Sequence, residues 1–244
     1  MGKYLIDNHN KFDKSIILFP YAGGGTNIYK NWPSAFKDFN VLRILYPGRE
    51  NRFSEQPLND INNLVFEIYE EMLETYNFDN EYYLFGHSMG TKVVYELALK
   101  IKHNEKLPNP KGIIISAGRA PCYKEKNPIY HLDKEDFIEG LKLYGGTPKE
   151  VLENKDLMNL FLPMLKADFI IDEEYQDKLN EKLESPIFAL MGTHDSQIEL
   201  AELLEWGRYT TSDFKYEYVN GGHMFVNDNP DEVICKIKEY LNDL

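Results

Sequence analysis

The chain has 244 residues, of which 43% are apolar and 27% charged, a composition typical of a globular protein with one sizeable core. Its formal net charge of −13, with no stretch that concentrates Lys and Arg, argues against a nucleic-acid partner. No apolar run approaches the roughly 20 residues of a membrane helix. The first residues lack the apolar core and cleavage site of a signal peptide, so we expect a cytoplasmic protein with no membrane partner.

Short apolar runs alternate along the chain with segments of helical periodicity. Strands are expected at 15–19, 40–46, 82–85, 112–116, 186–191 and 214–219. Helices are expected at 58–76, from 91 to about 102, and at 231–241. Strands that alternate with helices predict an α/β fold with a mostly parallel sheet covered on both faces. Because no repeat or low-complexity linker interrupts the chain, we expect a single domain spanning 1–244.

One segment, about 119–184, breaks this alternation. Its apolar residues recur at helical spacing around Phe137 and again around Phe161, with Gly145-Gly146-Thr147-Pro148 between the two runs. An insertion of this length is either a structural helical cap or a lid over the site. We favour a lid that helps to form an apolar substrate channel, since it follows a strand whose carboxyl end should face the site.

A serine lies between two glycines in Gly86-His87-Ser88-Met89-Gly90, directly after a predicted strand and before a predicted helix. This is the setting of the G-x-S-x-G nucleophile elbow, a strained turn that only small flanking residues allow. The pattern alone arises easily by chance, but its placement is informative. We therefore predict that Ser88 is a catalytic nucleophile.

Serine needs a general base, and in elbow hydrolases the chain order is Ser, then acid, then His. His223, just past the last predicted strand, alone follows both Ser88 and a plausible acid, so we predict it as the base. The other histidines are expected in packing, loop, lid or surface roles: His9, His87, His103, His131 and His194.

The predicted acid is Asp195, which follows the strand before the His223-bearing one. Such a loop is also a good place for a turn-capping aspartate. Glu199 and Asp213 are fallback candidates, although Glu199 is expected to be already helical.

Negative charge on a tetrahedral intermediate requires preorganised N–H donors. One should be the amide of Met89, which follows the nucleophile, and the other the amide of Ala22 or Tyr21 in the loop after the first strand. That loop contains Gly23-Gly24-Gly25, which lets the backbone approach a substrate closely. A phosphate-binding loop is disfavoured because no Gly-Lys-Ser/Thr follows, and a plain tight turn stays open as the simpler interpretation.

Two cysteines make neither a disulfide framework nor a zinc site. Cys235 lies in an apolar-periodic helix and is expected in the core. Cys122 lies in a loop with no histidine near it in the sequence, so a catalytic role is not expected.

Along most of its length the sequence resembles the stand-alone type II thioesterases of nonribosomal peptide and polyketide synthesis. The matching segments are Phe19-Pro20-Tyr21-Ala22-Gly23-Gly24-Gly25, Tyr46-Pro47-Gly48-Arg49-Glu50-Asn51-Arg52, the elbow, 145–148, 162–169 and 222–225. The lid segments are the most specific, since generic α/β-hydrolases lack them. Lys166 stands where the family usually has Arg, which loses any bidentate contact, and Ser196 where it often has Pro.

The resemblance implies an α/β-hydrolase fold with a helical lid insertion, and hydrolysis of acyl thioesters on the phosphopantetheine arm of carrier domains. By analogy, Ser88, Asp195 and His223 form the triad, with the Ala22 and Met89 amides as the oxyanion hole. Stalled or mis-primed acyl groups would be cleared without a metal or diffusible cofactor. The expected partner is a peptidyl or acyl carrier domain, and the family suggests a monomer.

Two alternatives remain at this stage. A carboxylesterase or lipase acting on free small esters would use the same fold and triad, because neither fixes the substrate. A catalytically inactive module that binds an acylated carrier is less favoured, because all three candidate triad residues are present.

Overall fold

Seven strands form one central sheet in the computed structural model, which describes residues 3–7, 12–75, 81–177 and 179–243. The strands are β1 (Leu5–Ile6), β2 (Lys14–Phe19), β3 (Asn40–Ile44), β4 (Glu81–His87), β5 (Gly112–Ser116), β6 (Ile187–Gly192) and β7 (Phe214–Val219). Their spatial order is β1-β3-β2-β4-β5-β6-β7, with β1 antiparallel to β3 and all other pairs parallel. The predicted α/β fold with a mostly parallel sheet is confirmed.

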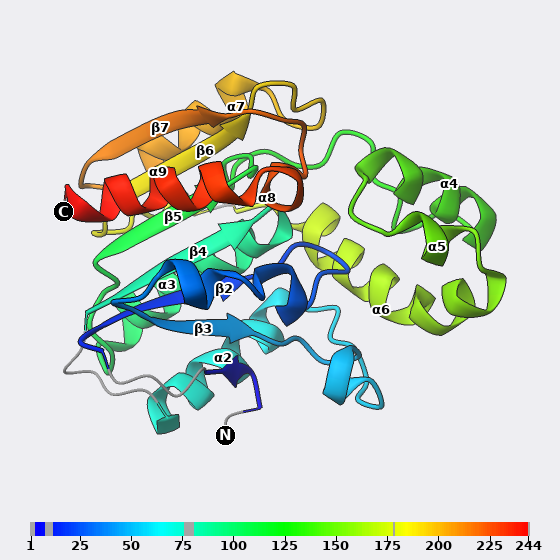
Figure 1. Ribbon diagram of the computed structural model, residues 1–244, viewed down its shortest axis with the longest axis horizontal. Coiled ribbons are helices and arrows are strands. Elements are labelled where there is room, and N and C mark those ends of the chain that lie inside the picture. Colours follow the sequence, from blue (N-terminus) through cyan, green and yellow to red (C-terminus); the bar gives the residue numbers. More distant parts are fainter. Residues whose placement is uncertain (1–2, 8–11, 76–80, 178, 244) are drawn as a thin grey trace.

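Helices cover both faces of this sheet (Figure 1). The α-helices are α1 (Trp32–Ala35), α2 (Ile61–Thr75), α3 (Met89–Asn104), α4 (Lys134–Tyr144), α5 (Lys149–Leu152), α6 (Lys155–Glu174), α7 (Leu200–Leu204), α8 (Phe225–Asp228) and α9 (Pro230–Asn242). The described residues also include the short 3₁₀ helices η1 (Thr26–Tyr29), η2 (Glu50–Arg52) and η3 (Glu205–Tyr209).

Apolar side chains of the strands alternate between two cores. In β2, Ile17 and Phe19 join the core that contains residues of α2, α3 and η3. Ile16 and Leu18 point to the opposite core, which contains residues of η1, α1 and α9. A strand buried on both faces must be apolar at every position, which is why the continuous apolar runs identified these strands.

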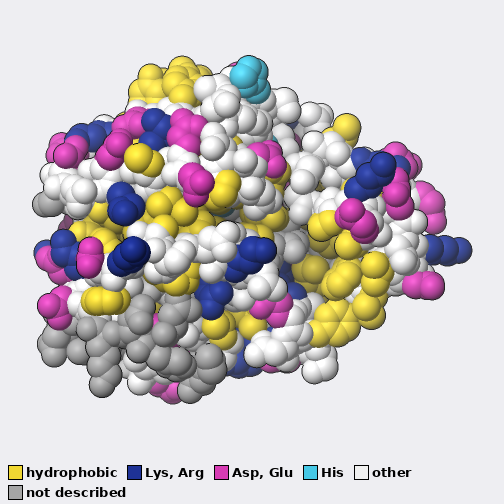
Figure 2. Space-filling model, viewed as in Figure 1, with side chains coloured by type: hydrophobic (Ala, Val, Ile, Leu, Met, Phe, Trp, Pro, Cys, Tyr) yellow, Lys and Arg dark blue, Asp and Glu magenta, His cyan; other side chains and the backbone are white. Residues whose placement is uncertain are grey.

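The segment between β5 and β6 holds α4, α5 and α6, which stand beside the carboxyl ends of the strands (Figure 1). We call this segment, residues 117–186, the helical insertion. It has a small core of its own that includes Phe137, Leu141 and Phe169. Apolar side chains also gather on the surface of this part of the molecule (Figure 2). Leu160 of α6 is 50% exposed.

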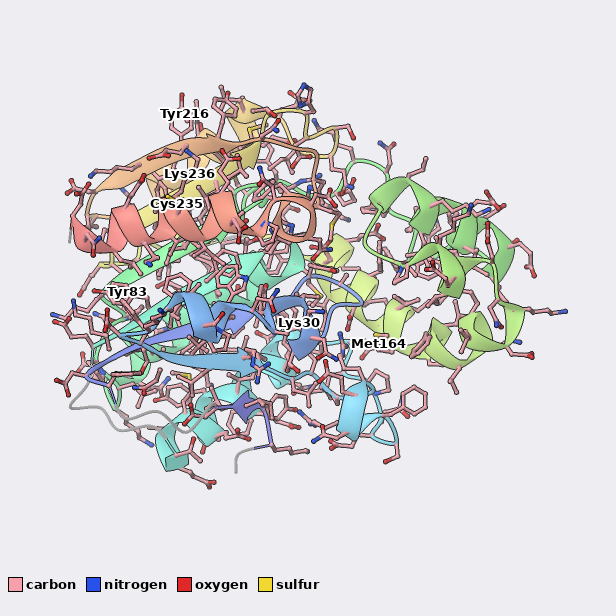
Figure 3. All side chains as sticks on the ribbon, viewed as in Figure 1. Lys30, Tyr83, Met164, Tyr216, Cys235 and Lys236 are labelled. Carbon is pink, nitrogen blue, oxygen red and sulfur yellow. The ribbon has the colours of Figure 1, made fainter. Side chains whose placement is uncertain are left out.

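Cys235 is exposed, so its expected place in the core is wrong (Figure 3). The buried stripe of α9 consists of Val233, Ile234, Ile237, Tyr240 and Leu241. At 3.6 residues per turn, Cys235 falls just outside this stripe, and its Sγ lies 3.4 Å from Glu239 Oε1 on the exposed side.

Within the described ranges, no helix combines the length and the apolarity that crossing a bilayer requires.

Candidate active site

Ser88 occupies a sharp turn between β4 and α3, with backbone angles φ +52° and ψ −118°. The two flanking glycines are required by sterics. A Cβ on Gly86 would lie 2.4 Å from the Gly90 carbonyl oxygen, and a Cβ on Gly90 would lie 2.4 Å from the Phe19 carbonyl oxygen. Because both obstacles are backbone atoms, neither can move aside as a flexible side chain would. The sequence thus fixes a strained turn that presents the serine hydroxyl at the edge of the sheet.

Three predicted residues meet at this turn. His223 follows β7, and its Nε2 lies 3.0 Å from Ser88 Oγ. Asp195 follows β6, and its Oδ2 lies 2.9 Å from His223 Nδ1. The carboxyl ends of β4, β6 and β7 lie on one edge of the parallel sheet, so residues far apart in the chain are brought together. A hydroxyl, an imidazole and a carboxylate in this order can deprotonate the hydroxyl.

Asp195 is held as a carboxylate. Its side chain is 0% exposed. Burial by itself would raise the pKa of Asp195, but the hydrogen bond and the nearby charge of His223 lower it, as do the amides of Gln197 and Ile198, which donate to Oδ1. The net result is a pKa below the ordinary value of aspartate. An ionised Asp195 accepts a hydrogen from Nδ1, which leaves Nε2 free to accept the serine proton.

His87, next to the nucleophile, is fully buried and directed away from Ser88. Its Nδ1 lies 2.9 Å from Ser116 Oγ, and its ring packs edge-on against Phe225 and Tyr21. Burial, together with the neighbouring His223, holds the pKa of His87 well below that of a free histidine. His87 is therefore a neutral packing residue close to Ser88 and His223.

The other histidines and the two fallback carboxylates lie away from Ser88 or make other contacts. His103 Nε2 lies 2.7 Å from Glu181, and His194 Nδ1 lies 2.9 Å from Thr193 Oγ1. His131 packs against the ring of Tyr130, and His9 falls outside the described residues. Glu199 caps α7, and Asp213 precedes β7 at the opposite end from His223.

The two predicted oxyanion donors flank the nucleophile. Ala22 lines a cavity together with Ser88, and Met89 begins α3 directly after it. Neither amide donates a hydrogen bond to another described residue, whereas the Gly24 amide donates to the Tyr21 carbonyl at 2.8 Å. The alternative donor, Tyr21, lines the same cavity, and its hydroxyl accepts from Asn227 Nδ2.

Sequence reasoning missed a buried ion pair behind the glycine loop. Arg49 Nη1 lies 2.7 Å from Asp168 Oδ2, and Nη2 lies 2.7 Å from Oδ1. The same Oδ2 accepts the Gly23 amide at 2.7 Å, and Arg49 Nη1 donates to the Gly24 carbonyl at 2.8 Å. Arg49 and Asp168 both lie in segments that carried the family resemblance, but no pattern indicated that they touch.

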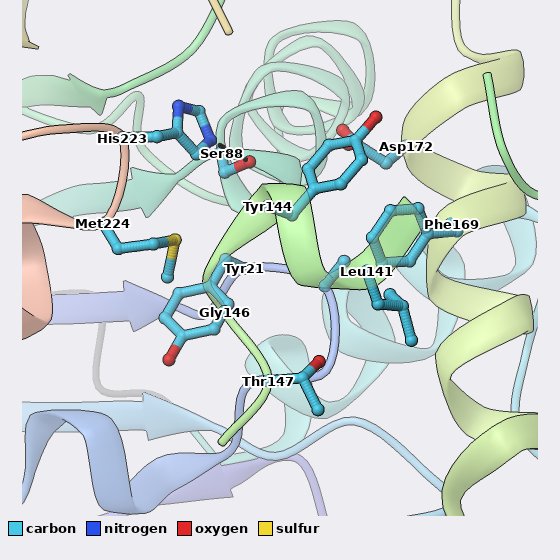
Figure 4. Close-up of a pocket in the computed structure, with 11 residues that line it drawn as sticks. Tyr21, Ser88, Leu141, Tyr144, Gly146, Thr147, Phe169, Asp172, His223 and Met224 are labelled. Carbon is cyan, nitrogen blue, oxygen red and sulfur yellow. Dashed lines mark hydrogen bonds between the residues drawn. The ribbon is translucent and has the colours of Figure 1, made fainter. Parts of the chain in front are cut away.

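Two cavities meet at Ser88 and differ in their lining. The first is mainly apolar, with Leu141, Phe169 and Met224 in its wall (Figure 4). The second contains charged side chains, among them Lys92 and Arg119. Ser88, Tyr144, Asp172 and His223 line both. A substrate at Ser88 is therefore flanked by an apolar and a polar space.

Lys166, which replaces the family's usual arginine, donates to the Leu132 carbonyl at 2.7 Å and lies over the Phe137 ring. The lysine makes one hydrogen bond here and lacks the planar fork with which an arginine could make a bidentate contact. In the part of the chain that the structure describes, no three His, Cys, Asp or Glu side chains are grouped so as to hold a metal ion.

Proteins with known names are similar over nearly the whole length. Gramicidin S biosynthesis protein GrsT of Aneurinibacillus migulanus is 34% identical over 91% of this chain and 87% of its own. Linear gramicidin dehydrogenase LgrE of Brevibacillus parabrevis is 31% identical over 98% of this chain and 93% of its own. YbtT, the type II thioesterase from the yersiniabactin NRPS/PKS biosynthetic pathway, has a solved structure that is 27% identical, covers 96% of both chains and superposes with a TM-score of 0.86.

These similarities confirm the resemblance to type II thioesterases. The model of the thioesterase domain matches residues 14–241, from the first residue of β2 to the last turn of α9. The chain therefore belongs to the thioesterase domain family.

Proposed function

We propose that this chain hydrolyses acyl thioesters on the phosphopantetheine arm of peptidyl or acyl carrier domains, and so removes stalled or mis-primed acyl groups. The observation that carries the proposal is the hydrogen-bonded chain from Asp195 through His223 to Ser88 within a thioesterase-family fold. The relatives named for gramicidin S biosynthesis and for the yersiniabactin NRPS/PKS pathway support the carrier-bound substrate.

In the proposed reaction, Ser88 Oγ attacks the thioester carbonyl carbon while His223 Nε2 takes its proton. The tetrahedral oxyanion receives hydrogen bonds from the amides of Ala22 and Met89. Collapse of this intermediate breaks the carbon–sulfur bond, and His223 returns the proton to the leaving pantetheine thiol. Water, activated by the same histidine, then hydrolyses the acyl-enzyme.

The proposal includes a single hydrolase domain over 1–244 in which a lid of about 119–184 covers the acyl group. Tyr144 and Phe169 of the helical insertion line the apolar cavity beside Ser88, which supports this role. We further propose a cytoplasmic monomer whose partner is the carrier domain. Since the chain carries a net charge of −13, docking to an acidic carrier would depend on a local patch.

The name of one relative, a dehydrogenase, suggests a second activity. Dinucleotide binding at the first strand-to-helix turn uses G-x-G-x-x-G. Here Gly23-Gly24-Gly25 is followed by Ile28 where the third glycine would stand. The loop instead directs its Gly23 amide to Asp168. Thioester hydrolysis is therefore the function that the site supports best.

The test compares three substrates with wild type and Ser88→Ala: acetyl-phosphopantetheinyl carrier protein, acetyl-CoA and p-nitrophenyl acetate. We expect kcat/KM to be highest for the carrier-bound thioester and hydrolysis of all three to disappear in Ser88→Ala. If the enzyme instead hydrolysed the p-nitrophenyl ester and did not turn over the loaded carrier, the role of Ser88 would stand. The protein would then be a hydrolase of small free esters and not a carrier thioesterase.

A further inference from the structure

A buried ion pair lies one helical turn from the nucleophile. Lys92 lies in the first turn of α3, four residues after Ser88, and both side chains line the polar cavity. Lys92 Nζ lies 2.5 Å from Asp172 Oδ1 and 2.5 Å from the Asp172 carbonyl oxygen. The two side chains are 7% and 12% exposed. The ammonium thus joins α3 to the last turns of α6.

Both members of the pair face the place where an acyl group would lie. Lys92 and Asp172 line the polar cavity together with Ser88 and His223, and Asp172 also lines the apolar cavity. Figure 4 shows Asp172 and Tyr144 in the wall of the apolar cavity that also contains Ser88. The charge pair therefore belongs to the wall around the reacting carbonyl and not to a remote part of the core.

Stability does not account for this pair. Two charges lose their hydration on burial, and replacement of such a pair by apolar side chains of similar size is often neutral or stabilising. A purely aliphatic pocket would also suit a fatty acyl chain better, because apolar carbon gains nothing from charged neighbours. The polar cavity instead holds a second ion pair, with Arg119 Nη1 2.7 Å from Glu125 Oε2.

Lys92 and Asp172 differ in the hydrogen-bonding groups that they leave available for a substrate. Lys92 spends two of its donors on Asp172, one on the carboxylate and one on a carbonyl near the end of α6. Asp172 Oδ2 accepts no hydrogen bond from any described residue and is not sealed from the cavity. A carboxylate oxygen that is open toward the substrate suits a cationic donor.

We propose that Asp172 selects acyl groups that carry an ammonium on the carbon next to the thioester carbonyl, which are aminoacyl thioesters. Lys92 is then a positioning residue that fixes the carboxylate through its other oxygen. An acyl group with a methyl in place of the ammonium would leave Asp172 Oδ2 desolvated and without a donor, and sites built for a polar group discriminate strongly against such analogues. This specificity rests on the proposed thioesterase function.

The test uses two acyl groups of the same shape. Carrier protein loaded with alanyl-phosphopantetheine is compared with carrier loaded with isobutyryl-phosphopantetheine, which replaces the ammonium by a methyl. We expect wild type to favour alanyl in kcat/KM by about 10- to 100-fold, the range of a hydrogen bond to a charged group. Asp172→Asn should reduce this ratio by at least about tenfold.

A matched double variant, Lys92→Met/Asp172→Leu, removes both charges at similar side-chain volume. It should fold, because an ion pair exchanged for apolar side chains leaves no unpaired charge. Its alanyl-to-isobutyryl ratio should approach one. A purely structural role for Asp172 would instead lower kcat/KM for both substrates in the same proportion and leave the ratio unchanged, which would overturn the assignment.

A methylmalonyl-loaded carrier, of similar shape but anionic, completes the set. If wild type preferred methylmalonyl to alanyl, Lys92 or Arg119 would be binding the substrate carboxylate. That result would overturn the proposal that Asp172 recognises an ammonium. Equal turnover of alanyl and isobutyryl carriers would also reject it while the thioesterase function stands. Hydrolysis of p-nitrophenyl acetate with no turnover of any loaded carrier would reject both.

Discussion

Asp168 and Arg49, 119 residues apart in the chain, face each other through two parallel N–O contacts of 2.7 Å. Their side chains are 3% and 5% exposed. The same carboxylate accepts the Gly23 amide, so α6 of the helical insertion holds the loop that carries Ala22. The position of the predicted oxyanion donor therefore depends on a helix that also lines the apolar cavity, through Phe169 and Asp172.

Asp168→Asn should both destabilise the protein and slow the reaction. Loss of the carboxylate charge leaves Arg49 buried without its counter-ion, which costs about 3–5 kcal/mol. Displacement of the loop by about 1 Å should lower kcat by about 100-fold. Urea denaturation and steady-state kinetics measure the two effects. Glu205→Gln is the control, because Arg208 and Glu205 form an exposed pair in which loss of the charge should cost under about 1 kcal/mol.

The three side chains at the elbow should act as one unit. Ser88→Ala and His223→Ala are each expected to lower kcat by about 10⁶, and Asp195→Ala by about 10⁴. The double variant Ser88→Ala/His223→Ala should be no slower than either single variant, since the unit is already inactive. Single-turnover hydrolysis of a loaded carrier measures these rates. A His223→Ala variant that retained most of its activity would move the general base elsewhere.

Glu173 should make stability depend on pH. Burial raises its pKa to about 7, against the opposing effect of the Ile129 and Tyr130 amides and the Tyr144 hydroxyl that donate to it. A carboxyl whose pKa is higher in the folded state is protonated there while the unfolded chain has already lost the proton. The contribution of Glu173 to the free energy of unfolding is thus fully present below pH 4.5, the pKa of the carboxyl in the unfolded chain. It is lost as the pH rises to the folded-state pKa of about 7.

Glu173→Gln keeps the protonated shape at every pH. We expect the free energy of unfolding of wild type to fall relative to that of this variant as the pH rises from 4.5 to about 7. The total decrease should be up to about 3 kcal/mol. Denaturant titrations of both proteins at pH 5 and pH 8 provide the comparison. A constant difference across this range would show that Glu173 ionises normally in the folded protein.

The elbow glycines should tolerate no side chain. Gly86→Ala and Gly90→Ala place a Cβ 2.4 Å from a backbone oxygen, so we expect each to cost more than about 3 kcal/mol or to prevent folding. Gly222→Ala is the matched control, because the atom nearest to its Cβ, the His194 carbonyl oxygen, would be 3.8 Å away. Thermal unfolding of the three variants should separate Gly222→Ala, close to wild type, from the other two.

Local patterns predicted the scaffold well for physical reasons. The inner strands β2, β4, β5 and β6 are buried on both faces, so their apolar runs are nearly uninterrupted. The G-x-S-x-G turn is dictated by contacts within five residues and with one neighbouring strand. Chain order then limited the base to His223 and favoured Asp195 as the acid over Glu199 and Asp213, and the structure brings His223 and Asp195 to Ser88.

The sequence could not reveal contacts between side chains that are far apart in the chain and meet only in the folded protein. The Arg49–Asp168 and Lys92–Asp172 pairs connect α6 to residues more than 70 positions away, and no periodicity records such a contact. Strand ends were also overextended. Residues 45 and 46 were expected in the strand that ends at Ile44, but the Leu45 amide donates to the Tyr4 carbonyl at 2.8 Å instead of extending the parallel ladder.

One continuous stretch, the helical insertion, supplies much of the wall of the apolar cavity, while Ser88 and His223 project from strand ends outside it. Evolution can therefore change the acyl range of such an enzyme by exchanging a single gene segment while the reaction is retained. The spacing of two aspartates on α6 indicates which positions such an exchange must respect. Asp168 has to remain because it holds the glycine loop, whereas position 172, one turn further on, can vary with the cargo only together with its ion-pair partner, Lys92.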